Sequence, residues 1–410
     1  MFGAPIMYVL LFLSLYVEVF LLVSFLERRV VARLSPFKLL RDEDAPSVAI
    51  VVPCFNEEKT VATTIESLLA LDYPVGKLEI LVVDDGSSDR TSAEAERFAS
   101  DARVRVFRKE NGGKHTAMNL GLSQTDAQFI GCLDADSVVA SDALRVVMPL
   151  FTNTAIAAVT PGIHVREPHT FLQHLQKVEY TLSIFNRFMM AALGSVFITP
   201  GPFSIFRSSV VRELDGWKYA HSTEDMEMAL RIQSVGHLIA NAPTAIVHTT
   251  TPSTLPHLFH QRVRWTYGWL RNAVDYRYMF GNYRFGNLGL LVLPFAIFSI
   301  FTGIYFFVRV LLFAGLTAYE KVVQFFYAGF LPPSFVFDAF YIPSSTLLIL
   351  VWVSVALVFA LICIGSFIGT GKRVPPLSTP LFLLFYSFLV PLWLSVAVVR
   401  AAFKTGVQWR

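Results

Sequence analysis

The chain has 410 residues, of which 54% are hydrophobic and only 16% are charged, and its mean hydropathy is +0.53. A soluble globular protein has about 25% charged residues, so a wholly soluble enzyme and a disordered chain are both excluded. Three cysteines are too few for a disulfide scaffold, and a net charge of +3 gives no argument for binding nucleic acid. Most charges lie within residues 27–287, which predicts one water-facing domain between membrane-embedded flanks.

The N-terminal flank contains an apolar segment over residues 6–26, whose one charged residue is Glu18. As a helix this segment spans about 31 Å, enough to cross the hydrocarbon core. It lacks a basic leader and a small-residue cleavage site, so residues 1–28 are predicted to form a membrane anchor. The bases Arg28 and Arg29 follow, and the positive-inside rule places the N-terminus outside the cell. Glu18 is expected either to line a pathway or to pack against another helix.

Three further spans are predicted within residues 286–410, at 288–308, 346–368 and 380–399. In this arrangement Lys372 and Arg373 are cytoplasmic, but Arg400 and the bases after it lie outside, which breaks the positive-inside rule. A fifth crossing through 319–341 would bring the tail inside and move Lys372 and Arg373 out. The charges and prolines of that segment indicate an interfacial or re-entrant stretch, so four spans are predicted.

The region between the flanks alternates strands and helices. Strands are predicted over 47–54, 78–83, 104–107 and 129–133, and helices after an N-cap at Asn56 and over 89–99 and 115–122. This alternation indicates an α/β domain, over residues 45–253, with a mostly parallel sheet. Ligands of such sheets bind at the carboxyl ends of the strands.

Acidic residues follow two of these strands. Asp84 and Asp85 come after the second strand, where they either accept hydrogen bonds from a nucleoside or form a capped turn. Asp134 and Asp136, after the fourth strand, point to opposite sides of an extended chain, so one can reach a divalent cation and the other the substrate or the scaffold. Carboxylate oxygens favour Mg²⁺ or Mn²⁺, which can bridge a diphosphate.

Two further motifs supply a candidate cation, after a glycine turn, and a candidate general base, at the start of a helix. Lys114 follows two glycines at the start of a predicted helix, where it could meet a phosphate, although the spacing is not that of a Walker P-loop. Ser222 and Thr223 are candidate N-caps, and Glu224 and Asp225 follow them. The acids either stabilise the first turn of the helix or supply a general base, Asp225.

The last motif lies in an amphipathic region, 254–285, which is predicted to lie in the membrane interface. It contains Gln261, Arg264 and Trp265 among other basic and aromatic residues. The region is either an anchor alone or part of the site, with Trp265 stacking on a sugar ring and Arg264 reaching the diphosphate.

Together these motifs resemble those of membrane-embedded family-2 glycosyltransferases with a GT-A domain. The resemblance covers about 45–285 and rests on PCFNEE (53–58), VVDDGSSDRT (82–91), NGGKHTAMN (111–119), DAD (134–136), GPFSIFR (201–207), STED (222–225) and QRVRW (261–265). Their order and spacing are similar to those of chitin-oligosaccharide, hyaluronan, poly-N-acetylglucosamine and cellulose synthases.

The resemblance implies a role for each motif. The donor-binding residues would be Glu57, Asp84 and Asp85 at the nucleoside of a UDP-sugar, Lys114 at its diphosphate, and Asp134 and Asp136 at Mg²⁺ or Mn²⁺, with Asp136 as the main metal ligand. The acceptor side would consist of Asp225 as catalytic base with Glu224 beside it, Gly201 and Pro202 at the border, and Gln261, Arg262, Arg264 and Trp265. Thr199 and Pro200 stand where the family often has Ser or Cys before the Gly-Pro pair, so the donor sugar stays open.

The implied function is inverting transfer from a UDP-sugar to a growing β-linked oligosaccharide or polysaccharide, processive and coupled to export. The resemblance also implies an integral plasma-membrane protein with a cytoplasmic catalytic domain. One alternative is a non-processive transferase with a lipid or lipid-linked acceptor. Another is an inactive nucleotide-sugar-binding or transport subunit, which the intact base, D-x-D and acceptor motifs argue against.

Overall fold

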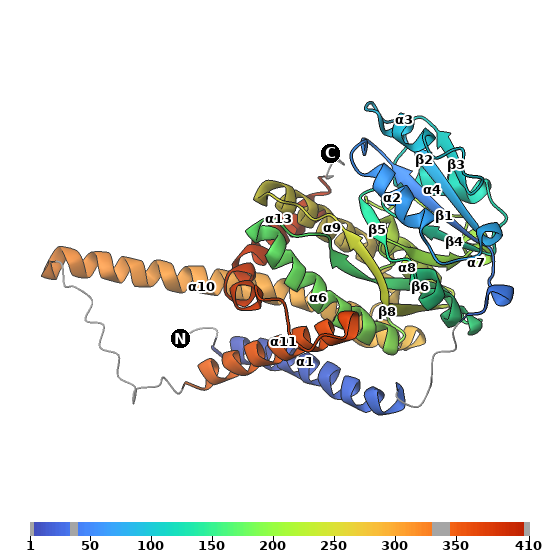
Figure 1. Ribbon diagram of the computed structural model, residues 1–410. Helices are drawn as coiled ribbons and strands as arrows, with labels where there is room; N and C mark the ends of the chain where they lie inside the picture. Colours follow the sequence, from blue (N-terminus) through green and yellow to red (C-terminus); the bar gives the residue numbers. More distant parts are fainter. Residues whose placement is uncertain (1–3, 33–39, 330–344, 406–410) are drawn as a thin grey trace.

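The computed structural model describes residues 4–32, 40–329 and 345–405. Within these ranges one mixed sheet of eight strands has the order β3-β2-β1-β4-β7-β6-β8-β5 (Figure 1). The strands are β1 (Val48–Cys54), β2 (Leu78–Asp84), β3 (Val104–Arg108), β4 (Phe129–Cys132), β5 (Ser137–Val139), β6 (Ile156–Val165), β7 (Ser204–Arg207) and β8 (Leu238–Thr249). The four strands predicted from the sequence are all present, and they pair in parallel.

Strand β1 shows why this half of the sheet forms. Its apolar side chains are buried on both faces, as in a parallel sheet covered by helices on each side. Ile50 and Val52 pack in one core layer with residues of α2 and α5, whereas Val51 packs in the other with residues of α4 and α8. Beyond β4 the direction changes, because β7 is antiparallel to both β4 and β6.

Helices cover both faces of the sheet. They are α2 (Val61–Leu69), α3 (Thr91–Glu96), α4 (Lys114–Ser123), α5 (Ala143–Val147), α7 (Ser208–Glu213) and α8 (Glu224–Ser234). Asn56 is not the N-cap of α2, which the sequence had suggested. It has a positive φ of 56°, its side-chain oxygen accepts a hydrogen bond from the Ser88 amide, and α2 begins only at Val61.

Two longer helices, α6 (Phe171–Ala192) and α9 (Leu255–Asp275), connect the sheet domain to the apolar helices. The apolar helices are α1 (Ala4–Ala32), α10 (Leu293–Ala328), α11 (Thr346–Thr370), and a C-terminal helix made of α12 (Thr379–Leu381), a π-helical stretch (Phe382–Tyr386) and α13 (Ser387–Phe403). Among the described residues these four are long and apolar enough to cross a membrane.

Helix α10 is longer than the span predicted at 288–308, because it continues to Ala328. The first part of the segment 319–341 is therefore continuous with α10, and the part from residue 330 lies outside the described residues. Glu18 of α1 meets α11, where the Ser354 hydroxyl donates to its carboxylate at 3.2 and 3.3 Å. This contact gives Glu18 a helix-packing role, one of the two expected from the sequence.

Candidate active site

The strand register brings the first acidic residues to one edge of the sheet. Cys54, the last residue of β1, pairs with Asp84, the last residue of β2, and Cys132 at the end of β4 pairs with Val51 of β1. Because the three strands are parallel neighbours, Glu57, Asp84 and the residues after Cys132 all follow the carboxyl ends of adjacent strands.

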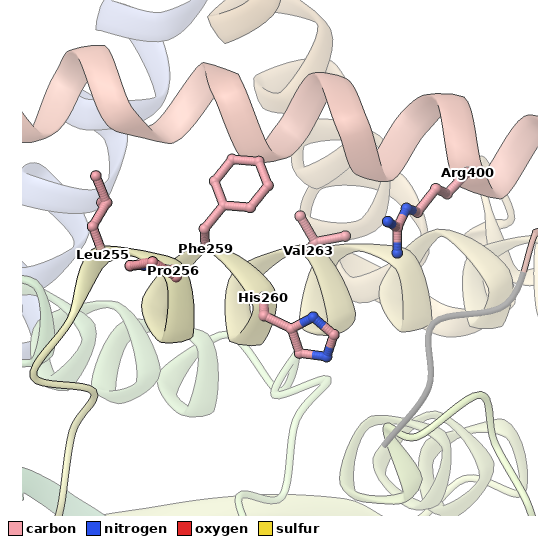
Figure 2. Close-up of a pocket in the computed structure, with 6 residues that line it drawn as sticks. All are labelled: Leu255, Pro256, Phe259, His260, Val263 and Arg400. Carbon is pink, nitrogen blue, oxygen red and sulfur yellow. The ribbon is translucent and has the colours of Figure 1, made fainter. Parts of the chain in front are cut away.

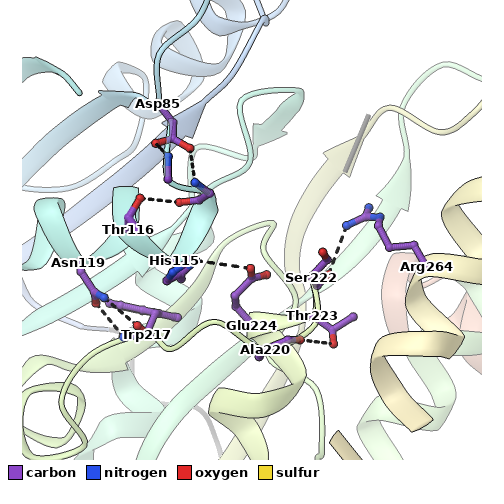
Figure 3. A network of polar contacts seen from close by, with 12 residues as sticks. Asp85, His115, Thr116, Asn119, Trp217, Ala220, Ser222, Thr223, Glu224 and Arg264 are labelled. Carbon is purple, nitrogen blue, oxygen red and sulfur yellow. Dashed lines mark hydrogen bonds and ion pairs between the residues drawn. The ribbon is translucent and has the colours of Figure 1, made fainter. Parts of the chain in front are cut away.

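Asp85 differs from the predicted donor contact, because both of its carboxylate oxygens are taken by the protein. They accept hydrogen bonds from the amides of Gly112 and Gly113 at 3.0 and 2.8 Å (Figure 3). Lys109 Nζ donates a further bond at 2.5 Å. Gly113 has a φ of +89°, a conformation that favours glycine. Asp85 therefore holds the glycine turn in shape and so places Lys114, the first residue of α4.

Asp84, in contrast, has only one of its two carboxylate oxygens in a hydrogen bond. Its Oδ1 accepts a hydrogen bond from the Ser87 amide at 2.9 Å, and its Oδ2 lies 3.6 Å from the Arg108 guanidinium. Oδ2 is buried and has no hydrogen-bond partner. A buried carboxylate oxygen without a partner is costly, so this atom is suited to accept a hydrogen bond from a bound nucleoside.

Three segments meet at the Lys114–Asp134 pair. The Lys114 ammonium donates a hydrogen bond to Asp134 Oδ1. A Cβ added to Gly201 would lie 2.5 and 2.6 Å from the Asp134 carboxylate oxygens, so only glycine lets this loop approach so closely. Burial alone would lower the pKa of Lys114, but the charge and hydrogen bond of Asp134, together with the charge of Asp225, outweigh it and raise that pKa, so the lysine is cationic.

Negative charge accumulates around Asp136. Its Oδ1 accepts a hydrogen bond from the Ser137 hydroxyl at 2.9 Å. Burial, together with the charges of Asp134 and Glu57, raises the pKa of Asp136 to about 7. These hard oxygen donors and their excess negative charge fit a divalent cation. Among the described residues no three His, Cys, Asp or Glu side chains form a metal-binding group, so diphosphate oxygens and water would complete the coordination.

Asp225 lies in the first turn of α8 and is held there through its backbone. Its carbonyl oxygen accepts hydrogen bonds from the Thr199 amide at 3.0 Å and the Thr199 hydroxyl at 2.7 Å. Two residues after Thr199, Gly201 lies against the Lys114–Asp134 pair, so one loop touches both this pair and the Asp225 backbone. In the sequence Thr199 stands out only as a departure from the family pattern. In the structure it positions the candidate base.

The pKa of Asp225 predicts the pH dependence of the reaction. Burial, reinforced by the charges of Glu224 and Asp134 and opposed by Lys114, raises the pKa of this carboxyl to about 6. A general base acts in its ionised form, so at saturating Mn²⁺, which would keep Asp136 ionised, kcat/KM should rise with pH up to about 6 and level off above it. Initial rates between pH 4.5 and 8 test this. A rate that stays constant down to pH 4.5 would contradict the assignment.

Glu224 faces α4. Glu224 is 8% exposed, and its carboxylate lies 4.0 Å from His115 Nδ1, within ion-pair distance when His115 is protonated (Figure 3). Glu224 thus joins the start of α8 to the residue next to Lys114. Thr223 occupies the N-cap position, but its hydroxyl donates to the Ala220 carbonyl at 3.0 Å and does not cap the helix.

Helix α9 packs directly on the start of α8. The Asn272 amide donates to the Thr223 hydroxyl at 2.9 Å, and the Arg264 guanidinium donates to the Ser222 carbonyl at 3.4 Å. A Cβ on Gly268 would lie 2.9 Å from Thr223 Cβ and closer still to its hydroxyl and methyl groups. Ser222 itself has a φ of 64°, which is unusual for a residue other than glycine. The position of α9 and that of the candidate base are therefore coupled.

Gly268→Ala is expected to lower kcat at least about tenfold, because the added methyl must push α9 away from Thr223. Helix propensity alone would favour alanine by about 1 kcal/mol, so an unchanged or higher kcat would contradict the coupling. Gly315→Ala in α10 is the matched control, since a Cβ there meets nothing within 4 Å. Steady-state kinetics of both variants compares them.

Arg262, which was predicted for the acceptor side, is engaged by the protein itself. Its guanidinium is buried and pairs with Glu179 of α6 at 2.7 Å, and the Tyr386 hydroxyl donates to the same Glu179 oxygen at 2.7 Å. Arg262 also lies 4.4 Å from the Trp265 ring centroid. Arg262 is therefore part of the packing between helices, and one face of Trp265 is covered by it. Gln261 has a buried side-chain oxygen without a hydrogen-bond partner.

Comparison with known proteins identifies the family. The model described as "Glycosyltransferase like family 2" matches residues 45–268, more than half of the chain. The chain belongs to glycosyltransferase family 2. It is thus an enzyme of the transferase class, as the motifs had indicated.

Two relatives of this family-2 glycosyltransferase carry the same name. A poly-beta-1,6-N-acetyl-D-glucosamine synthase of Staphylococcus epidermidis is 28% identical over 302 residues, which cover 73% of this chain and 72% of the relative. The synthase of that name from Staphylococcus aureus (strain COL) is 30% identical over 261 residues, 63% of each chain.

Among solved structures, a mannosyltransferase from Pyrobaculum calidifontis in complex with GDP-Man and Mn²⁺ aligns with a TM-score of 0.61 and 17% identity. The alignment covers 97% of this chain and 99% of that one. At this identity the likeness concerns the fold alone, which is the GT-A fold with apolar helices that the sequence had indicated.

Proposed function

We propose that this glycosyltransferase transfers N-acetylglucosamine from UDP-N-acetylglucosamine to a growing β-linked polysaccharide at the membrane. The names of the relatives support the sugar and the polymer. The observation that carries the proposal is that one segment touches both groups: Thr199 holds Asp225, and Gly201 lies against the Lys114–Asp134 pair. This supports a site in which a base, a cation and metal-binding carboxylates act together.

The donor side supplies nucleotide recognition and leaving-group stabilisation. Asp84 Oδ2 accepts a hydrogen bond from the nucleoside, and the Lys114 ammonium offsets charge that develops on the departing UDP. Asp136 and Asp134 would hold Mg²⁺ or Mn²⁺, which when bound neutralises diphosphate charge and stabilises UDP as a leaving group. The pairing of Asp134 with Lys114 leaves Asp136 as the main ligand.

The acceptor side supplies the base. Asp225 takes the proton of the acceptor hydroxyl while that oxygen forms a bond to C1 of the sugar and the bond from C1 to the diphosphate oxygen breaks. Attack from the face opposite the leaving group converts an α-linked donor into a β-glycoside in one step. This direct displacement needs one carboxylate base and no covalent intermediate on the enzyme.

The helices define the surroundings of the acceptor. Helix α9 is fixed to the base segment through Gly268 and Asn272, and it connects the sheet domain to the apolar helices. The bases at residues 28–29 and 271–284 favour a cytoplasmic catalytic domain. A product formed beside these helices would enter the membrane as it grows, so the proposal includes processive synthesis with export.

Purified full-length chain in lipid nanodiscs with Mn²⁺ tests the proposal. UDP release is measured with UDP-N-acetylglucosamine, UDP-glucose, UDP-glucuronate and GDP-mannose, and the product is sized by mass spectrometry. The expected result is metal-dependent UDP release with UDP-N-acetylglucosamine and a ladder of polymer lengths. A single added sugar would contradict processivity and support a lipid-directed transferase. No metal-dependent release with any donor would overturn the enzymatic proposal.

A further inference from the structure

The C-terminal helix, residues 379–403, is apolar enough to cross a membrane, yet its contacts differ from those of the other three apolar helices. Each of those three has one end on the sheet domain and the other end away from it. Phe25 packs against Phe185 of α6 near the end of α1, whereas Phe12 is 65% exposed. Helices α1, α10 and α11 extend in Figure 1 to the same side, away from the sheet.

The same pattern holds for α10 and α11. Helix α10 begins in a cluster with Trp269 and Met279, and near its far end Tyr327 is 90% exposed. Helix α11 begins at exposed residues, and near its end Gly365 and Gly369 lie against α6. Each of these helices therefore runs from the sheet domain outward, or back to it, as a membrane span must.

The C-terminal helix instead contacts α6 and α9 along its length, and Leu394 and Val398 also pack on the part of α10 nearest the sheet domain. Ser378, just before it, donates a hydrogen bond to the His174 carbonyl of α6 at 2.8 Å. Tyr386 binds Glu179 of α6 at 2.7 Å. Farther along, Trp393 packs in one cluster with Leu258 and Val263 of α9.

The far end of this helix also returns to α9. Figure 2 shows α13 running alongside α9, with Arg400 at a groove of about 380 Å³ lined by Leu255, Pro256, Phe259, His260 and Val263. Helix α9 itself begins just after β8 and packs on α8 near its end, so both of its ends belong to the sheet domain. A helix that follows α9 and contacts α6 at its start stays beside the sheet domain throughout.

We infer that residues 379–403 do not cross the membrane, but lie along α6 and α9 with the outward face in the lipid leaflet next to the catalytic domain. That face is apolar and exposed: Leu381, Leu384, Phe385, Phe388, Leu392, Val399 and Phe403 are each more than 40% accessible. The inward face, which packs on α6 and α9, is largely apolar as well and includes Trp393 and Ala397. A helix that is apolar on both faces has the hydropathy of a span without being one.

The charges agree with this arrangement. Three crossings, α1, α10 and α11, place the C-terminus on the side of the catalytic domain. Arg400 and Lys404 then lie on the same side as Lys372 and Arg373, whereas four crossings separate them. The positive-inside rule is satisfied by three crossings and broken by four. This inference goes beyond the proposed function, since it concerns the path of the chain through the bilayer and not its chemistry.

Cysteine accessibility in the full-length chain tests the inference. Thr405→Cys, Ser123→Cys in the catalytic domain and Gln324→Cys near the far end of α10 are made singly with Cys363 replaced by Ala, since Cys54 and Cys132 are buried. A membrane-impermeant maleimide is applied to intact cells and again after permeabilisation. Thr405→Cys should label in the same condition as Ser123→Cys and opposite to Gln324→Cys. Labelling of Thr405→Cys on the side opposite to Ser123→Cys overturns the inference.

Depth measurement gives a second, independent readout. Spin labels at the exposed positions 381, 388 and 399 are compared for accessibility to oxygen and to a water-soluble nickel complex. A helix lying in the leaflet gives three similar, shallow depths. A crossing helix gives its greatest depth at 388 and shallow values at both ends, which overturns the inference.

Discussion

Asp225→Asn is expected to lower kcat by about a thousandfold, within the range of about 10²–10⁴ that general base catalysis contributes. The amide cannot take the proton of the acceptor hydroxyl, but it keeps nearly the same shape. Its oxygen can still accept the Met226 amide hydrogen bond, which is 2.9 Å long in the structure. The backbone contacts with Thr199 do not involve the side chain and are unaffected.

The readout separates chemistry from folding and binding. UDP release gives kcat, calorimetry gives the affinity for UDP with Mn²⁺, and thermal unfolding confirms the fold. Affinity and melting temperature should stay near those of the native chain. Asp126→Asn, an exposed position on the sheet domain, is the matched control and should keep full activity. If Asp225→Asn turned over at the native rate, another residue would have to be the base.

Asp136→Asn is expected to lower kcat/KM at least about a hundredfold at a Mn²⁺ concentration that saturates the native enzyme. Stabilisation of a leaving group by a metal is worth several kcal/mol, and about 1.4 kcal/mol corresponds to a factor of ten. The loss has this size because Asp136 is the carboxylate not paired with Lys114. Part of the activity should return when Mn²⁺ is raised further, since the remaining ligands still bind the cation weakly.

A Mn²⁺ titration of the rate checks this. The apparent Mn²⁺ constant should rise for Asp136→Asn and stay constant for Asp142→Asn, an exposed aspartate on the same domain. Equal Mn²⁺ dependence of Asp136→Asn and the native chain would show that this carboxylate does not hold the metal.

Much of the α/β half could be predicted because local pattern decides it. The apolar run at β1 is buried on both faces, so composition alone marks it as a central parallel strand. Parallel neighbours then bring the residues after them to one edge, which is why the sequence predicts a common site for Asp84 and Asp136. The alternation could not show that β7 reverses direction, since that depends on the return path of the chain.

Side-chain roles that depend on tertiary packing could not be predicted from the sequence pattern. Asp85 and Asp84 are adjacent and of the same type, yet only the approach of Gly112 and Gly113 makes Asp85 a holder of the turn. Arg262 lies in a basic-aromatic motif, and its pairing with Glu179 depends on how α6 meets α9. Gly268 gave no signal in the sequence, because a glycine inside a helix matters only when a neighbour comes close.

Hydropathy also could not separate a membrane span from the arrangement inferred for the C-terminal helix. It measures how apolar a segment is and not which partner covers it, so protein on one face and lipid on the other give the same value as a span. The misplaced charges of Arg400 and its neighbours were the available warning.

The most direct test of the account is the binding of UDP to the purified chain, measured by calorimetry with and without Mn²⁺. If the carboxylates at the sheet edge share one cation-bound nucleotide, UDP should bind at least tenfold more tightly with Mn²⁺, and both Asp84→Asn and Asp136→Asn should weaken that binding. Equal affinity with and without the metal, or no effect of either substitution, would show that these residues do not form a common nucleotide site.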